Sequence, residues 1–145
     1  MGNAYTDRVG GDRAANVEAA VACYRVALEV HTREAAPLAW AATQNNFGNA
    51  YTDRVGGDRG ANVEAAVACY RLALEVRTRE AAPQGWASLT WNMFMALQES
   101  ERWVDALAAA RTVQAFGSEW ASWNEKQAYL ASCIASLEGK VGVSS

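Results

Sequence analysis

Few side chains in this sequence combine the type and the spacing that covalent or metal chemistry requires. There is a single histidine, His31, and none of the three cysteines forms a recognisable catalytic pair with it. A glycine-rich phosphate loop and a cluster of metal-ligating side chains are also missing from the sequence. Catalytic and metal sites need several such groups converging at one place. We therefore expect no catalytic residue, no metal and no cofactor, and we predict that the protein is not an enzyme.

The cysteines are Cys23, Cys69 and Cys133, and the first two stand 46 residues apart at the same position of a repeated segment. Equivalent positions of stacked helical repeats lie about 10 Å apart, which is the spacing of packed helices. That separation is too large for a disulfide bond. We expect all three to be buried, reduced thiols, as in a cytoplasmic protein.

The elements that position the remaining polar residues come from this repeat. The segment from Gly2 to Phe47 is followed at once by a near copy, residues 48–93, and 36 of the 46 aligned positions are identical. A period of about 20 to 50 residues indicates units that bury their apolar faces only by stacking on one another. His31 corresponds to Arg77 in the second copy, and a position that accepts either residue belongs to the surface.

The composition indicates a globular chain with a protein partner rather than a nucleic acid or a membrane. Apolar residues make up 51% of the sequence, charged residues make up 20%, and the net charge is −3. This balance is typical of a folded domain. No block of lysine and arginine occurs, so we expect no nucleic-acid or membrane partner.

Helical periodicity covers most of the chain. In the segment of about 13–34, and again in about 59–80, apolar residues recur at three- and four-residue steps. The first of these segments carries two apolar stripes: Val17, Ala20, Val21, Tyr24, Ala27 and Leu28 form one, and Ala19, Cys23, Val26 and Val30 form the other. A helix that is apolar on two faces is expected to lie between neighbouring helices.

Shorter helical patterns begin at Pro37 and Pro83, where proline is tolerated at the first helical position. Gly48 lies in the middle of the first pattern and costs about 1 kcal/mol relative to alanine, so we expect a neighbouring helix to approach it closely. Asp12 and Asp58 follow paired glycines and are the expected N-caps of the long helices.

Two further helices are expected near the C-terminus, over about 103–116 and 119–138. Gly117 should end the first of them, and Ser118 should cap the second.

These spacings resemble the tetratricopeptide repeat (TPR). Phe47-Gly48 and Tyr51 match its first helix, and Ala66, Tyr70 and Ala73 match its second. The copies are longer than the usual repeat and resemble a variety common in bacterial multidomain proteins, where it accompanies caspase-like or signalling NTPase domains. The resemblance implies an all-α, right-handed α-solenoid of about seven helices with a C-terminal capping helix.

The domain organisation follows from this resemblance. We expect one TPR-like domain, residues 1–138, made of repeats 2–47 and 48–93, a diverged third unit 94–117 and a capping helix 119–138. Residues 139–145 are expected to be a flexible tail.

In the family, the first helix of each repeat lines a concave groove. Carried over, the groove positions are Asn3, Thr6 and Asp7 in the first copy, Asn45, Asn49, Thr52 and Asp53 in the second, and Trp91, Met95, Gln98 and Glu99 in the third. Asparagine both donates and accepts hydrogen bonds and so suits a peptide backbone, while Trp91 and Met95 would form an apolar pocket. Alternatively, Asn45, Asn46 and Asn49 only join neighbouring helices.

The resemblance implies a non-catalytic scaffold that binds a peptide or protein segment in this groove. The groove is more acidic than basic because of Asp7, Asp53 and Glu99. It therefore differs from the basic carboxylate clamp of chaperone-binding TPR domains.

The alternative function is self-assembly, as a homodimer through the N-terminal hairpin. The apolar face of the helix expected over 13–34 has an incomplete neighbour, and such a face invites pairing with another copy. The chain is possibly a fragment of a larger bacterial signalling protein, in which case other repeats would cover that face.

Overall fold

The computed structural model describes residues 17–54 and 58–142, and in this part of the chain the fold is all-α with no strand. Residues 17–30 are helical, and they are followed by α2 (Pro37–Asp53), α3 (Arg59–Val76), α4 (Pro83–Glu99), α5 (Trp103–Phe116) and α6 (Trp123–Val141). A short 3-10 helix, η1 (Gly117–Glu119), separates the last two. The predicted all-helical fold class is confirmed.

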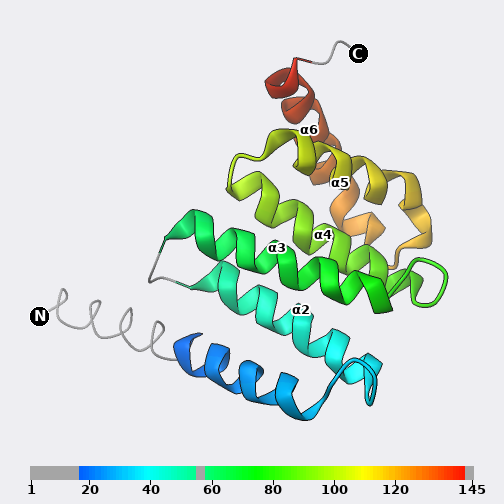
Figure 1. Cartoon of the computed structure of the whole chain (residues 1–145). Coiled ribbons are helices and arrows are strands. Elements are labelled where there is room, and N and C mark those ends of the chain that lie inside the picture. Colours follow the sequence, from blue (N-terminus) through cyan, green and yellow to red (C-terminus); the bar gives the residue numbers. More distant parts are fainter. Residues whose placement is uncertain (1–16, 55–57, 143–145) are drawn as a thin grey trace, which may run out of the picture.

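The helices pack in chain order, as expected of a helical repeat (Figure 1). α2 packs on α3, α3 on α4, α4 on α5 and α5 on α6, and α2 also reaches α4. By contrast, no Cα atom of α4 lies within 8 Å of one in α6, although both helices are described over their full length. The first helices of successive hairpins therefore diverge towards the C-terminal end of the molecule.

Helix starts follow the sequence signals. Pro37 and Pro83 each occupy the first turn of their helix. The carboxylate of Asp58 accepts hydrogen bonds from the backbone N–H groups of Gly60 and Ala61, at 2.8 and 3.4 Å, and so caps α3. Gly117 ends α5 with a φ of 57°, a conformation that glycine adopts without strain. The expected cap Asp12 lies outside the described residues.

The glycine in the middle of α2 is explained by the ring of Tyr70. A Cβ atom built on Gly48 would lie 2.6 Å from Tyr70 Cε1 and 2.9 Å from two further ring atoms. Tyr70 is only 1% exposed and belongs to the main core, so its ring has no free space to move into. The predicted close approach is confirmed, and it allows α2 and α3 to pack tightly.

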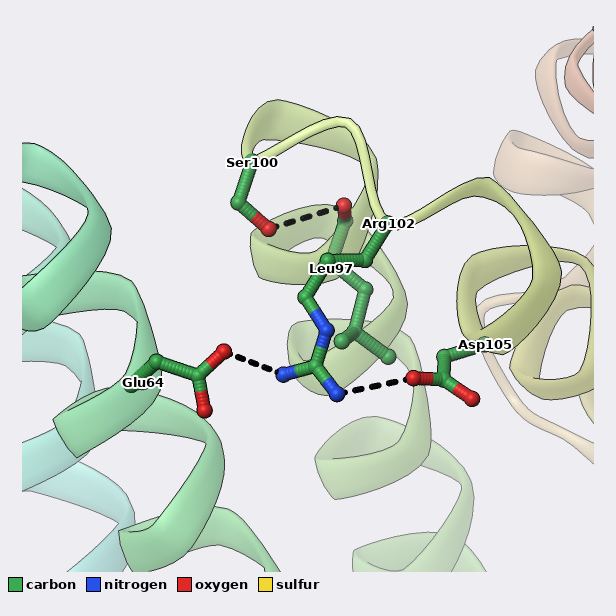
Figure 2. A network of polar contacts seen from close by, with 5 residues as sticks. All are labelled: Glu64, Leu97, Ser100, Arg102 and Asp105. Carbon is green, nitrogen blue, oxygen red and sulfur yellow. Dashed lines mark hydrogen bonds and ion pairs between the residues drawn. The ribbon is translucent and has the colours of Figure 1, made fainter.

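Two equivalent ion pairs join successive hairpins. In each, the arginine that follows the first helix of one hairpin pairs with a glutamate on the second helix of the hairpin before it. Arg54 donates to Glu18, with Nη2 and Oε2 3.1 Å apart. Arg102 donates to Glu64, the repeat counterpart of Glu18, and to Asp105 at 2.8 Å (Figure 2). These pairs fasten each turn to the second helix of the previous hairpin.

In the turn between α4 and α5, other residues stand where the earlier turns of the sequence have paired glycines. Ser100 donates its hydroxyl to the carbonyl of Leu97 at 3.1 Å (Figure 2). Glu101 takes a φ of 62°, in the left-handed region that a glycine would occupy more easily.

The last helix differs from the prediction: it begins at Trp123 rather than Glu119 and ends at Val141 rather than residue 138. Ser118 is part of η1 and not an N-cap. The reason is tertiary. Gln84 donates to the carbonyl of Glu119 at 2.7 Å and accepts from the N–H of Ala121 at 2.8 Å, which satisfies the backbone of this segment without a helix.

One prediction about the cysteines is wrong. Cys69 and Cys133 are buried, but Cys23 is exposed. Cys69 packs with Val21 of helix 17–30, in the preceding hairpin, and with Phe47 and Ala50 of α2, in its own hairpin. In the first copy, the segment that corresponds to α2 lies within residues 1–16, which are outside the described part of the chain.

No helix within the described residues is long and apolar enough to cross a membrane.

Candidate functional site

A cavity of about 450 Å³ opens on the surface formed by α2, α4 and α6, which we call the α2–α4–α6 surface. This volume is typical of a ligand-binding cleft. The residues that line the cavity come from α2, α3, α4, α5 and α6. They are Asn49, Thr52, Tyr70, Asn92, Met95, Ala96, Gln98, Glu99, Trp103, Tyr129, Cys133, Ser136, Leu137 and Lys140.

The structure brings together residues that the repeat makes equivalent. Of the eight predicted site residues within the described chain, five line the cavity: Asn49, Thr52, Met95, Gln98 and Glu99. Asn49 and Met95 are one pair of repeat counterparts, and Thr52 and Gln98 are another. Corresponding turns of α2 and α4 therefore face the same cavity. Asn3 and Asp7, together with Thr6, lie outside the described residues.

On the α2 side, Asn49 is fixed by the buried phenol of Tyr70. The Tyr70 hydroxyl donates to Asn49 Oδ1 at 2.6 Å, and the Thr52 hydroxyl donates to the carbonyl of Asn49 at 2.8 Å. Burial raises the pKa of Tyr70, which keeps this phenol neutral. Within the described part of the chain, Asn49 Nδ2 donates no hydrogen bond that accompanies these two contacts.

Asn45 lies beside the cavity and joins two helices. Asn92 Nδ2 donates to Asn45 Oδ1 at 3.1 Å, which connects α4 to α2. Asn49 also bonds a neighbouring helix, through Tyr70. Asn45 and Asn49 therefore do join neighbouring helices, as the alternative interpretation expected. Asn46 is exposed. Asn45 and Asn49 each use only the acceptor oxygen for this purpose.

Trp91 does not line the cavity but belongs to an aromatic cluster next to it. Its ring centroid lies 5.3 Å from that of Phe94, 5.7 Å from that of Trp120 and 5.9 Å from that of Tyr129. Lys126 Nζ lies 4.9 Å from the Trp91 ring centroid. The apolar pocket expected at Trp91 and Met95 is therefore divided: Met95 faces the cavity, and Trp91 supports its wall.

Charged groups gather where α2 and α4 end. Glu99, the last residue of α4, forms an ion pair with Arg59, and Arg59 Nη1 also donates to the carbonyl of Thr52 at 2.6 Å. Asp53, the last residue of α2, is exposed and does not line the cavity. Lys140 Nζ lies 4.6 Å from the Trp103 ring centroid.

The far wall of the cavity comes from α6, which the sequence analysis treated only as a cap. Its lining residues Tyr129, Cys133, Ser136 and Lys140 follow one another at steps of four, three and four, so they share one helix face. A hydrogen bond with Cys133 and burial raise the pKa of Tyr129, and a hydrogen bond with Gln98 opposes them. The regular spacing on 129–140 indicates that these residues share a helix face, but it does not indicate which helices that face lies against.

No cluster of three or more His, Cys, Asp or Glu side chains able to hold a metal occurs among the described residues. The cavity presents amides, hydroxyls and aromatic rings, together with the charged side chains of Glu99 and Lys140. Amides, hydroxyls and rings bind by hydrogen bonding and stacking. Comparisons with protein-family models, with curated proteins and with solved structures give no match for this chain.

Proposed function

We propose that this protein is a non-catalytic scaffold of the TPR type, a right-handed α-solenoid, that binds a peptide or protein segment on the α2–α4–α6 surface. The observation that carries the proposal is the convergence of repeat-equivalent positions on one cavity. Asn49 and Thr52 of α2 face it together with Met95, Gln98 and Glu99 of α4. A repeat that presents the same positions from each hairpin offers an extended ligand regularly spaced contacts.

The chemistry of the cavity suits a polypeptide. Asn49 and Gln98 can donate to and accept from peptide groups, and the Asn49 amide is held by the Tyr70 hydroxyl of the neighbouring helix α3. Met95, half-exposed among them, offers an adaptable apolar contact for a side chain. Preorganised donors and acceptors reduce the ordering that binding requires.

The test compares the wild type, a triple variant and a double variant of the whole chain by affinity capture followed by mass spectrometry. The surface variant is Asn49→Ala, Met95→Ala, Gln98→Ala. The control changes two exposed residues away from the cavity, Arg71→Ala and Gln114→Ala. We expect a partner that is captured by the wild type and the control and lost with the surface variant. Equal capture by all three proteins would contradict the proposal.

A second candidate function is assembly through helix 17–30. Two near-identical copies allow a direct comparison: Cys69 is 8% exposed in the second copy, whereas Cys23 is exposed in the first. On the same stripe, Val26 is 58% and Val30 is 68% exposed. Valines at this exposure form an apolar strip that a second copy of the chain would cover.

The structure offers an internal precedent for such coverage, because Cys69 on the equivalent stripe of α3 is covered by Val21 of helix 17–30 and by Phe47 and Ala50 of α2. A homodimer that places a helix of one copy on helix 17–30 of the other would supply the same kind of contact. Light scattering should then give twice the chain mass of 15.6 kDa, and Val26→Glu with Val30→Glu should restore the monomer. A monomer mass for the wild type at high concentration would exclude assembly.

A further inference from the structure

The end of the cavity at which α2 and α4 terminate is suited to positive charge. Glu99 lines the cavity, and its repeat counterpart Asp53 is the exposed last residue of α2. Asp53 forms no ion pair within the described residues. Both carboxylates also stand at helix C-termini, where the backbone carries a partial negative charge.

Aromatic rings add to this preference. Trp103 and Tyr129 line the cavity, and the raised pKa of the Tyr129 phenol keeps it uncharged. Ring faces attract ammonium and guanidinium groups, and the attraction is stronger the further the site is removed from water.

The chain's own lysines show that these rings accept cations. The sequence contains only two lysines, Lys126 and Lys140, and each places its Nζ over a tryptophan ring, Trp91 and Trp103 respectively. Lys140 lines the cavity and belongs to the exposed last turn of α6. Its ammonium has no ion-pair partner among the described residues. A cation of a ligand can therefore take its place over the Trp103 ring without breaking an ion pair.

We propose that the cavity binds a cationic side chain of the peptide partner, the guanidinium of an arginine or the ammonium of a lysine. In the complex this group lies near Glu99 and Asp53 and takes over the Trp103 ring from Lys140. Glu99 already pairs with Arg59, and Arg59 also donates to the Thr52 carbonyl, so the incoming cation shares the Glu99 carboxylate with Arg59. This inference rests on the proposed function, because it assigns the side chain that the same surface selects.

The test uses short acetylated and amidated Gly-Ser peptides with one central arginine, lysine, glutamine or glutamate, titrated into the whole protein and followed by NMR or calorimetry. The arginine and lysine peptides should bind about three- to tenfold more tightly than the glutamine peptide, and the glutamate peptide should bind most weakly. Lys140→Ala should strengthen binding of the arginine peptide by a similar factor. Lys126→Ala is the matched control, because Lys126 also lies over a tryptophan but does not line the cavity.

Two further variants complete the design. Glu99→Gln and Asp53→Asn should each weaken binding of the arginine peptide more than binding of the glutamine peptide. Equal binding of all four peptides, or weaker binding of the arginine peptide by Lys140→Ala, overturns the cation assignment but leaves the proposed peptide-binding function standing. Failure of the arginine peptide to bind also overturns the assignment, and the separate capture experiment then decides the proposed function.

Discussion

The hydroxyl of Tyr70 in α3 donates a hydrogen bond of 2.6 Å to the amide oxygen of Asn49 in α2. The two residues come from successive helices of one hairpin, and both line the cavity. One contact thus links the packing of the repeat to the surface that we propose binds a partner. It holds the Asn49 amide with its donor nitrogen available.

Removing this hydroxyl should weaken the fold modestly. We expect Tyr70→Phe to lower the free energy of unfolding by about 1 kcal/mol, since a net hydrogen bond contributes about that much. Urea unfolding of the wild type, Tyr70→Phe, Asn49→Ala and the double variant would give the coupling energy between the two residues. A coupling energy of zero would show that the hydrogen bond does not hold Asn49.

The same phenol should give a stability change at high pH. Because the pKa of Tyr70 is raised in the folded protein, the unfolded chain loses this proton first as the pH increases. The contribution is fully present below the pKa of an unfolded tyrosine, about 10, and decreases above it. We therefore expect Tyr70→Phe to unfold with a weaker alkaline pH dependence than the wild type. Identical alkaline profiles in chemical unfolding would contradict this.

The glycine of α2 should not tolerate a methyl group. Gly48→Ala would place a Cβ atom 2.6 Å from the buried Tyr70 ring, and we expect the free energy of unfolding to decrease by about 1 to 3 kcal/mol. Gly139→Ala in α6 is the matched control, since a Cβ atom there meets no atom within 4 Å. It should stabilise the protein by about 0.5 to 1 kcal/mol through helix propensity. Thermal unfolding of both variants measures the difference, and equal effects would rule out the close contact.

The three cysteines should differ in reactivity. Burial raises the pKa of Cys69 to about 11, and its side chain is covered, whereas Cys23 is exposed. At neutral pH, iodoacetamide should label Cys23 first, and labelling of Cys69 should require unfolding. Peptide mapping by mass spectrometry distinguishes the two sites, although their local sequences are nearly identical. Labelling of both at the same rate would show that the two copies are equally exposed.

The repeat offers a reciprocal exchange that tests the start of α6. Gln84 makes two hydrogen bonds to the segment before α6, while its counterpart Leu38 is 67% exposed. Gln84→Leu should cost about 1 kcal/mol, because it removes hydrogen bonds to the carbonyl of Glu119 and the N–H of Ala121, which are exposed enough for water to take its place in part. Leu38→Gln should change stability by less than about 0.5 kcal/mol. Equal effects in urea unfolding would contradict the role of Gln84.

The sequence by itself determined the features that depend on neighbours along the chain. Helical periodicity, the prolines at the starts of α2 and α4, the cap at Asp58 and the stop at Gly117 are local signals, and each is present in the structure. Even the close approach at Gly48 could be predicted, because a glycine inside a helix carries a cost that packing must offset.

Only the tertiary structure decided which equivalent residues differ. Cys23 and Cys69 share almost the same local sequence, yet one is exposed and the other buried, because burial depends on the helices packed alongside. The cavity wall formed by Tyr129 and Lys140 likewise depends on where α6 lies relative to α4, which no spacing within α6 specifies. Contacts between distant segments set these positions, and a local pattern carries no information about them.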